Sequence, residues 1–334
     1  MKTGKIIRLE IQSYILEWSR WWSGLSLFQK LLPLLLAIAY PSVIASLSQF
    51  TKLGGLRSDH FLTVCIAVSL WYLGPRLRTF FYFLLPLLLV AVVYDSMRYY
   101  SDLIRGQIHV SEPYQFDRFF FGISTSDGRL TPNEWLQKHT HPFWDVLCGF
   151  FYLTFIPIYV SICAYFCFRI ATVKNIDKRF NPMWAFFWVN VLGYSTYYWY
   201  AAAPPWYVAQ YGIGPANLHV MASAAGGTRF DSIFGTHFFS GMYGRAADVF
   251  GAIPSLHVAY PMQAVFYAFH YKALRIFSLF FYFIMCFSAV YLNHHYILDI
   301  LWGSSYAMIV CLFLEHVTKT PRLAPVRSSE TPLY

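Results

Sequence analysis

Apolar residues are gathered into eight long runs that are separated by shorter polar stretches. None of these runs alternates apolar and polar positions as the strands of a membrane barrel do, so we predict that each forms a helix. A membrane-spanning helix needs about 17–25 mostly apolar residues, and the runs fall within or close to this range. The eight predicted helices cover residues 31–49, 59–75, 79–95, 143–168, 182–202, 254–270, 275–293 and 296–316.

The composition agrees with a protein of the membrane. Of the 334 residues, 57% are hydrophobic and only 12% are charged, whereas a soluble domain carries roughly 25% charged residues. A net charge of +9 also occurs in nucleic-acid-binding proteins. In a chain this apolar, basic residues beside membrane spans explain that charge, so we expect no nucleic-acid partner. The six cysteines all lie in apolar runs and indicate neither a disulfide framework nor a zinc site.

Basic residues are unevenly distributed among the polar stretches. With eight spans, one side of the membrane receives both termini and every short basic connector, and it carries sixteen Lys and Arg against nine on the other side. Because positively charged loops stay in the cytoplasm, both termini are predicted to be cytoplasmic. The helices that start near Pro254 and Tyr296 then begin on the opposite face, which is the periplasm of a bacterium or the lumen of the Golgi.

We therefore predict an all-α fold, a polytopic membrane bundle of about eight transmembrane helices. Residues 1–78 are expected to form an amphipathic lead-in and two transmembrane helices. Residues 79–316 are expected to form a catalytic core of six helices, and residues 317–334 a disordered cytoplasmic tail. Two long loops, 95–142 and 203–253, lie on the non-cytoplasmic side in this topology.

Two motifs at the edges of apolar runs carry the candidate chemistry. His295 and Asp299 are four residues apart, so on a helix they share one face and the carboxylate orients the imidazole as a nucleophile or general base. Pro254 suits the first position of a helix, which would place Ser255 and His257 in the opening turn, where free N–H groups favour a phosphate. The predicted topology brings both motifs to one membrane face, which favours a joint functional site.

A metal site is an alternative interpretation of the same residues. His257, His294, His295 and Asp299 are residue types that bind zinc. However, neighbouring residues such as His294 and His295 point about 100° apart on a helix, and the chain has no His-Glu-x-x-His motif. We therefore expect neither a metal nor any other cofactor.

The stretch Pro-Ser-Leu-His at 254–257 and the spacing of Ser, His and Asp within 288–299 resemble two signature motifs of the type 2 phosphatidic acid phosphatase superfamily. The resemblance implies a helical bundle and metal-independent phosphoryl transfer through a phosphohistidine. It also implies that His295 is the nucleophile, that Asp299 orients it, and that His257 protonates the leaving alkoxide.

Three stretches are similar to the inositol phosphorylceramide synthase branch of that superfamily. They are Ala-Pro-Pro-Trp-Tyr at 203–207, Gly-Ala-Ile-Pro-Ser-Leu-His at 251–257 and Tyr-Leu-Asn-His-His-Tyr at 291–296. This resemblance implies transfer of phosphoinositol from phosphatidylinositol to the hydroxyl group of (dihydro)ceramide with release of diacylglycerol, so the expected partners are membrane lipids. The expected substrate contacts in these stretches are Ser255, which would bind a phosphate oxygen, and Tyr291, Trp206 and Tyr207.

The chain also departs from the superfamily pattern. Leu256 stands where the superfamily has Gly, Ala289 stands where it has Arg, and no Arg-Pro dipeptide occurs. The usual phosphate clamp is therefore missing, and another group must supply positive charge to the phosphate oxygens. The candidates are Arg98, Arg245 and His294.

Two other functions fit parts of the pattern. A lipid phosphate phosphatase would use water as the acceptor, with phosphatidic acid or a prenyl diphosphate as substrate. A non-enzymatic membrane protein, such as a transporter, would carry a decayed site. Transfer between lipids requires that water be kept from the phosphohistidine, and we expect the aromatic residues within 116–121 and at Trp206 and Tyr207 to form a lid.

Overall fold

The structure is a computed structural model that describes residues 2–52, 54–126, 128–170 and 178–318. The predicted disordered tail from residue 319 onward and most of the basic connector between 169 and 181 lie outside the described residues. In chain order the elements are α1 (Lys2–Gly24), α2 (Leu27–Thr51), α3 (Ser58–Tyr72), α4 (Pro75–Met97), α5 (Ser101–Ile104), β1 (Ile108–His109), α6 (Ser111–Phe120), β2 (Ile123–Thr125), β3 (Gly128–Leu130), α7 (Pro132–Lys138), α8 (Pro142–Tyr165), η1 (Phe166–Ile170), α10 (Asn181–Trp199), β4 (Ala201–Ala202), α11 (Pro205–Tyr211), α12 (Gly227–Phe234), α13 (Phe238–Tyr243), α14 (Leu256–Tyr271), α15 (Arg275–Tyr291) and α16 (Ile297–Val317).

Each of the eight predicted apolar runs forms a helix, namely α2, α3, α4, α8, α10, α14, α15 and α16, and α8 continues into the π-helical turn η1. Helix α10 ends at Trp199 rather than at residue 202, because Ala201 and Ala202 pair in a parallel ribbon with β1. The structure is mostly helical, but the described residues also contain four short strands, three in the first long loop and one directly after α10, which the all-α prediction did not include.

Four helical segments within the described residues are long and apolar enough to cross a membrane. They are Leu27–Thr51, Leu77–Met97, Pro142–Ile170 and Ile297–Val317. Helices α3, α14 and α15 have only 15, 16 and 17 residues, and a perpendicular crossing takes about 20. The protein therefore has several candidate spans of an integral membrane protein, fewer by this criterion than the eight that the sequence predicts.

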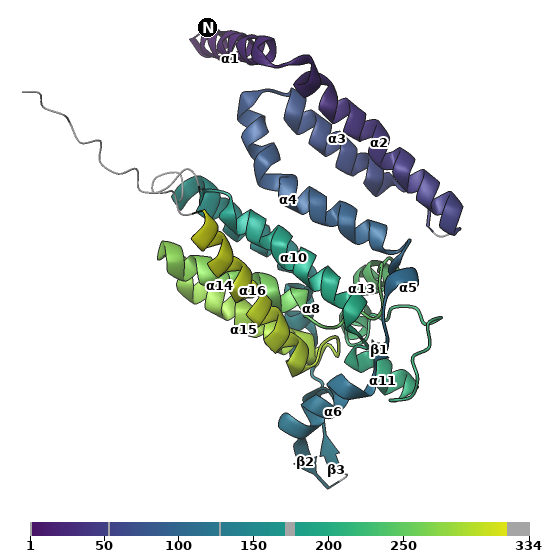
Figure 1. Ribbon diagram of the computed structural model, residues 1–334. Helices are drawn as coiled ribbons and strands as arrows, with labels where there is room; N and C mark the ends of the chain where they lie inside the picture. The colour runs from purple at the N-terminus through teal and green to yellow at the C-terminus, as the bar shows by residue number, and fades with distance from the viewer. Residues whose placement is uncertain (1, 53, 127, 171–177, 319–334) are drawn as a thin grey trace, which may run out of the picture.

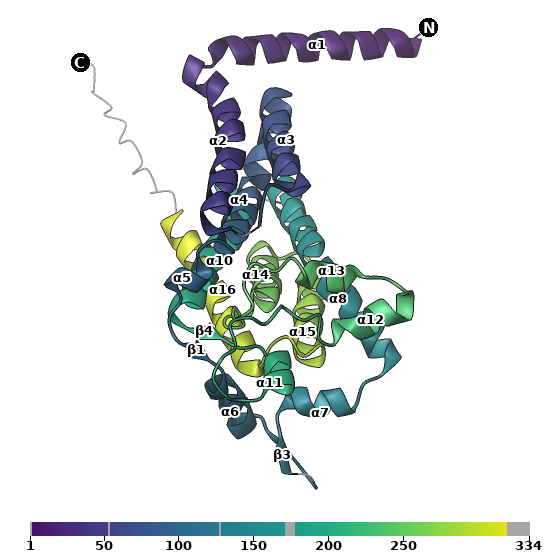
Figure 2. The same ribbon diagram turned by 90° about the vertical axis from the view of Figure 1, so that its right-hand side faces the viewer.

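Helix α14 lies at the centre of the bundle. It packs against α8, α10, α15 and α16, and Figure 1 shows these helices side by side. Helix α4 packs against α10 and also against α3, so the N-terminal helices α2 and α3 join the bundle through α4. Figure 2 shows α1 lying crosswise to α2, at the opposite end of the molecule from α6 and α7.

The polar side chains in the centre of the bundle are paired with tyrosines. The buried Gln263 of α14 accepts a hydrogen bond from the Tyr159 hydroxyl of α8 at 2.9 Å. The buried Asn190 of α10 accepts one from the Tyr260 hydroxyl of α14 at 2.7 Å. Because a buried polar group without a partner is costly, these bonds fix the register of α14 against α8 and α10.

The two long loops fold over the end of the bundle where α14 and α16 begin. The first loop contains α5, α6 and α7, and the second contains α11, α12 and α13. The β1–β4 ribbon joins the first loop to the end of α10, and an isolated bridge from Ala202 to Gly251 extends it to the second loop. This connection places residue 251 close to the start of α14, which carries one of the predicted catalytic histidines.

Candidate functional site

His257 lies in the first turn of α14. Ser255 is the N-cap residue and α14 begins at Leu256. The sequence predicted Pro254 at the first position of the helix, but Pro254 precedes the helix. The Ser255 backbone N–H donates to the Asp299 carbonyl oxygen at 3.0 Å, which joins the start of α14 to the start of α16. Gly303 of α16 permits this approach, because a Cβ atom there would lie 2.2 Å from the Ser255 carbonyl oxygen.

His295 and Asp299 are in contact, but they do not share a helix face. Helix α16 begins at Ile297, so His295 precedes the helix and Asp299 lies in its first turn. Oδ2 of Asp299 accepts hydrogen bonds from the Tyr296 backbone N–H at 2.9 Å and from Nδ1 of His295 at 3.2 Å. The four-residue spacing therefore acts through the N-terminal cap of the helix, and it still gives the imidazole an orienting carboxylate.

The two predicted catalytic histidines face each other. Nδ1 of His257 lies 3.2 Å from Nε2 of His295. Nδ1 of His295 has two acceptors, Asp299 and the Ala252 carbonyl oxygen at 3.1 Å, so we assign its proton to Nδ1. Nε2 of His295 then carries a lone pair, as a nucleophile at phosphorus requires, and it accepts a hydrogen bond from His257.

The turn that carries His295 is held by groups that the sequence analysis did not identify. The backbone N–H groups of His294 and His295 both donate to the Ala289 carbonyl oxygen, at 3.1 and 3.0 Å. The buried Asn133 of α7 donates to the carbonyl oxygen of His295 at 3.0 Å. Further donors to this turn are the side chains of Gln137 and Arg229, which bind the Tyr291 carbonyl oxygen, and the backbone N–H groups of Gly226 and Trp206, which bind those of Leu292 and Asn293.

A carboxylate from the first loop caps α16. Asp117 of α6 is fully buried, and its two oxygens accept the backbone N–H groups of Ile297 at 2.7 Å and Leu298 at 3.0 Å. Burial raises the pKa of Asp117 to about 7, although the two hydrogen bonds act in the opposite direction. The bonds satisfy N–H groups that the first turn of a helix leaves without an internal partner. No pattern within the loop sequence indicates this contact with a helix 180 residues away.

A cavity of about 860 Å³ opens in front of the two histidines. Tyr152 stacks on His257 with ring centroids 4.2 Å apart, and Tyr243 stacks on His294 at 4.5 Å. The cavity is lined by α3 and α4, by the inner faces of α8, α10 and α14, and by α13 and its flanking residues. It therefore combines apolar walls, which suit lipid chains, with a polar end at the histidines.

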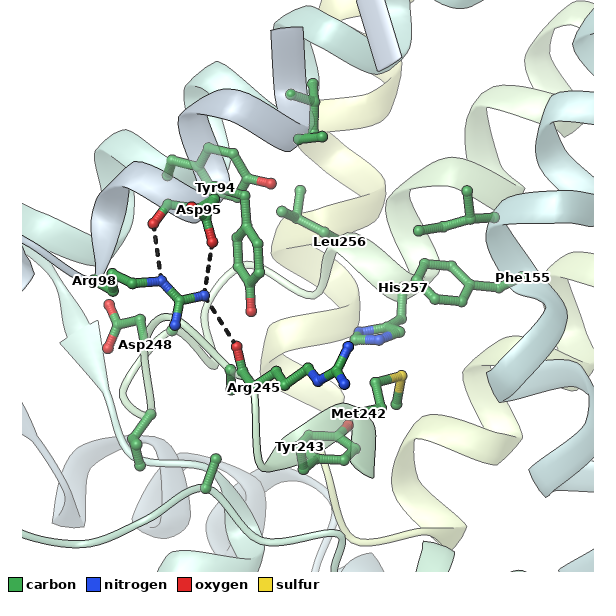
Figure 3. A pocket seen from close by; sticks show the side chains of 18 of the residues that line it. Tyr94, Asp95, Arg98, Phe155, Met242, Tyr243, Arg245, Asp248, Leu256 and His257 are labelled. Carbon is green, nitrogen blue, oxygen red and sulfur yellow. Dashed lines mark hydrogen bonds and ion pairs between the residues drawn. The ribbon is translucent and has the colours of Figure 1, made fainter. Parts of the chain in front are cut away.

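The two arginines proposed from the sequence both line this cavity but point in different directions. Figure 3 shows the Arg245 guanidinium pointing toward His257, whereas the Arg98 guanidinium is turned toward Asp95. Arg98 donates to an Asp95 carboxylate oxygen at 2.8 Å and to the Arg245 carbonyl oxygen at 3.3 Å. In the part of the chain that the structure describes, no hydrogen bond or ion pair engages the Arg245 side chain, so this cation is available to a ligand.

His294 also lines the cavity and is buried. Its Nε2 is buried and has no hydrogen-bond partner among the described residues. Burial, with the neighbouring His295, lowers the pKa of His294 well below its ordinary value. The side chain is therefore neutral near pH 7 and acts as a hydrogen-bonding group rather than as a cation.

The other predicted substrate contacts are placed differently. Ser255 is fully buried beside the cavity lining, and its Oγ has no partner in the described chain. Tyr291 lies outside the cavity and binds Asp145 through its hydroxyl at 2.9 Å. Trp206 lines the cavity, while Tyr207 is buried behind it against Phe250, so neither residue is exposed at a membrane surface.

The predicted aromatic lid is also placed differently. Phe119 and Phe120 are exposed on α6 and do not line the cavity, which is bordered instead by Phe238 and Met242 of α13. The reason is that Asp117 holds α6 against the first turn of α16, and no residue of α6 lines the cavity.

The model of the PAP2 superfamily matches residues 128–313, more than half of the chain. The chain belongs to the PAP2 superfamily. The matched region of this PAP2 protein contains His257, His295 and Asp299, together with α7 and the turn that Asn133 supports.

Several relatives of this chain within the superfamily are named as synthases of inositol-containing sphingolipids. The phosphoinositol dihydroceramide synthase of Bacteroides thetaiotaomicron is 36% identical over 268 residues, which are 78% of this chain and 85% of that protein. The inositol phosphorylceramide synthase catalytic subunits of Schizosaccharomyces pombe and Saccharomyces cerevisiae are each 27% identical, over 75% and 73% of this chain. The alignments cover 57% and 59% of these two yeast proteins, less than two thirds of their length. No solved structure shows a significant match. The PAP2 protein is thus a homologue of inositol phosphorylceramide synthases, which are phosphotransferases.

Among the described residues, no group of three or more His, Cys, Asp or Glu side chains is placed to hold a metal ion. Both ring nitrogens of His295 are engaged in hydrogen bonds within the site.

Proposed function

We propose that this PAP2 protein transfers phosphoinositol from phosphatidylinositol to the hydroxyl group of a (dihydro)ceramide, through a phosphohistidine on His295. The observation that carries the proposal is the line of contacts from Asp299 to Nδ1 of His295 and from Nε2 of His295 to Nδ1 of His257, each at 3.2 Å. The names of the relatives support the choice of lipids.

The first step forms the phosphohistidine. The phosphate of the donor lipid displaces the hydrogen bond between the two rings, and Nε2 of His295 attacks phosphorus. The bond between phosphorus and the diacylglycerol oxygen breaks. His257 is protonated in this step because the anionic phosphate binds beside it, and it gives its proton to that oxygen, so neutral diacylglycerol leaves. Asp299 holds the Nδ1–H of His295 and stabilises the positive charge that develops on the ring.

The second step uses the same groups in reverse. Neutral His257 takes the proton from the acceptor hydroxyl, whose oxygen attacks phosphorus. The bond between phosphorus and Nε2 of His295 breaks, which restores the free histidine and the imidazolium form of His257. The phosphoinositol group is then attached to the acceptor lipid, and the enzyme is ready for another donor.

Arg245 is proposed to replace the missing phosphate clamp. It reaches toward His257 and has no competing ion pair among the described residues. A guanidinium beside the phosphate stabilises the negative charge on the oxygens that do not leave. Arg98 is less suited to this role, because its guanidinium is already bound to Asp95 at 2.8 Å.

The surroundings of the histidines support transfer to a lipid over transfer to water. His295 is 6% exposed, His294 is 3% exposed and Asp299 is fully buried. Tyr152 and Phe155 cover the His257 ring, with centroids 4.2 and 4.5 Å away. Such an enclosure limits the access of water to a phosphohistidine and extends its lifetime until an acceptor lipid arrives.

The membrane placement is part of the proposal. We propose that the eight helices predicted from the sequence all cross or enter the bilayer, with both termini in the cytoplasm and the histidines near the non-cytoplasmic face. At that depth, both lipids reach the cavity sideways from the same leaflet. The excess of basic residues in the short connectors supports this orientation.

Purified protein in mixed micelles with labelled phosphatidylinositol and ceramide tests the function directly. We expect an inositol phosphosphingolipid and an equal amount of diacylglycerol from the wild type, and neither product from His295→Ala. Release of inositol phosphate at the same rate with and without ceramide would instead identify a hydrolase.

A further inference from the structure

A second polar cluster lines the same cavity as the histidines. It consists of Arg57, His60, Asp95 and Arg98, and we refer to it as the α3–α4 cluster. Arg57 immediately precedes α3, His60 lies in α3, Asp95 lies near the end of α4, and Arg98 follows it. Residues 57 and 60 belong to the region 1–78, which the sequence predicts to lie outside the catalytic core.

Asp95 organises the cluster. Its Oδ1 accepts hydrogen bonds from Arg57 at 2.5 Å and from Arg98 at 2.8 Å, and its Oδ2 is 2.8 Å from Nε2 of His60. Nδ1 of His60 accepts the backbone N–H of Arg57 at 3.2 Å, so its proton is on Nε2 and points to the carboxylate. The ring of His60 is therefore fully used within the cluster, and Asp95 holds two guanidinium groups in fixed positions.

Each of the two arginines keeps one end available. Arg57 uses its Nε and one terminal nitrogen for Asp59 and Asp95. Arg98 uses the same two positions for Asp95 and for the Arg245 carbonyl oxygen. In the described part of the chain the remaining NH1 group of each arginine has no hydrogen-bond partner and is not buried. Two oriented donor groups thus line the cavity without a protein acceptor.

The cluster is next to the reacting groups. Arg98 contacts the backbone of Arg245, and the Arg245 side chain extends from there toward His257. Figure 3 shows this sequence of side chains along the cavity wall, with Asp95 and Arg98 at one end and His257 at the other. A ligand whose phosphate lies between Arg245 and the histidines therefore has its next polar group close to Arg98.

We propose that the α3–α4 cluster binds the head group of the donor lipid and selects an oxygen-rich polyol head group over a cationic one. This inference rests on the proposed function. Guanidinium groups donate to hydroxyl and phosphate oxygens, and the partly exposed Asp59 is an acceptor for hydroxyl protons. The three arginines outnumber Asp59 and Asp95 along the cavity lining, and the remaining positive charge repels a choline or ethanolamine group.

The proposed reaction itself requires such a subsite. The head group stays attached to phosphorus while diacylglycerol leaves and the acceptor lipid enters. A site that holds it apart from the lipid chains keeps the phosphohistidine oriented during this exchange. The N-terminal helices then belong to the active site, because α3 supplies part of the head-group contact.

The test compares Arg57→Gln and Arg98→Gln with the wild type, using phosphatidylinositol, phosphatidylglycerol and phosphatidylcholine as donors. Arg118→Gln is the matched control, because Arg118 lies on α6 outside the cavity. We expect each cluster variant to raise the KM for phosphatidylinositol about tenfold, with kcat within a few-fold of the wild type. Soluble inositol 1-phosphate should inhibit the wild type, and inhibition of the two variants should need a correspondingly higher concentration.

A purely structural role predicts a different result. If the cluster only joins α3 to α4, the variants will lower the melting temperature and reduce turnover of every donor by the same factor, which would overturn the proposal. Arg98→Gln is the more decisive variant, because Arg98 binds Asp95 of its own helix and the Arg245 carbonyl oxygen but does not join α3 to α4. A wild type that prefers phosphatidylcholine would refute the head-group proposal while leaving lipid-to-lipid transfer intact. Failure of the wild type with all three donors would refute both.

Discussion

The side-chain amide of Asn133 donates to the carbonyl oxygen of His295 at 3.0 Å, although the two residues are 162 positions apart in the chain. The same amide donates to the carbonyl oxygen of Val290 at 3.1 Å. Asn133 thus closes the turn that presents His295 to the cavity. A residue of the first long loop therefore determines the position of the proposed nucleophile in the last part of the chain.

Asn133→Asp tests this positioning role. The substitution keeps the shape of the side chain but replaces the donating amide by a group that repels both carbonyl oxygens. We expect kcat to fall at least tenfold with little change in the KM for the donor, because the turn and not the cavity is disturbed. Each lost hydrogen bond costs about 1 kcal/mol or more of stability. Asn217→Asp, in the second loop, is the control, and equal kinetics for the two variants would contradict the role.

His257→Gln tests the acid and base roles separately from the nucleophile. With a lipid donor we expect turnover to fall by roughly two to four orders of magnitude, the usual contribution of a general acid or base. A donor with an acidic phenol as leaving group needs no protonation, so formation of the phosphohistidine from it should be far less impaired. His295→Gln should be inactive with both donors. An equal loss of His257→Gln with both donors would argue against proton transfer by His257.

Asp299→Asn should impair the nucleophile without changing the size of the side chain. An amide at this position no longer supplies a negative charge beside Nδ1 of His295, and it supports the wrong ring tautomer. We expect the formation of the phosphohistidine to slow roughly a hundredfold or more. Rapid-quench experiments with labelled donor measure this rate. Wild-type rates in this variant would show that the Ala252 carbonyl oxygen alone orients the ring.

Gly303→Ala should separate α16 from the start of α14. The added Cβ would lie 2.2 Å from the Ser255 carbonyl oxygen, and backbone atoms cannot yield to it as a flexible side chain could. We expect a destabilisation of about 1–3 kcal/mol, measured as a lower melting temperature in detergent, together with a loss of activity. Gly214→Ala is the control, because nothing lies within 4 Å of the position of its Cβ. Equal melting temperatures would show that the contact relaxes.

His294 should make the protein less stable in acid. Its pKa in the folded protein is well below that in the unfolded chain, chiefly because of burial. The unfolded chain therefore binds a proton that the folded protein does not, and stability falls as the pH decreases below about 6.5. In His294→Asn we expect a shallower decline of the melting temperature between pH 7 and pH 5. An unchanged decline would mean that other groups cause it.

Much of this protein was predictable from local sequence. Lipid requires that every backbone group be paired within its own helix, so long apolar runs become helices, and all eight predicted runs do. The short spacing between His295 and Asp299 also kept them in contact. Asp299 lies in the first turn of α16, next to the residues that immediately precede the helix. The superfamily motifs likewise indicated the PAP2 family before any geometry was available.

Only the tertiary structure decided which distant groups surround these histidines. Asn133, Asp117 and the α3–α4 cluster act across long stretches of chain, and their contacts depend on how the loops fold over the ends of α14 and α16. The choice between Arg98 and Arg245 likewise depends on Asp95, which binds the first and leaves the second directed at His257. Local sequence determines helices because their hydrogen bonds are local. The partners of a side chain depend on how distant segments pack together, and the spacing of residues along the chain does not predict that packing.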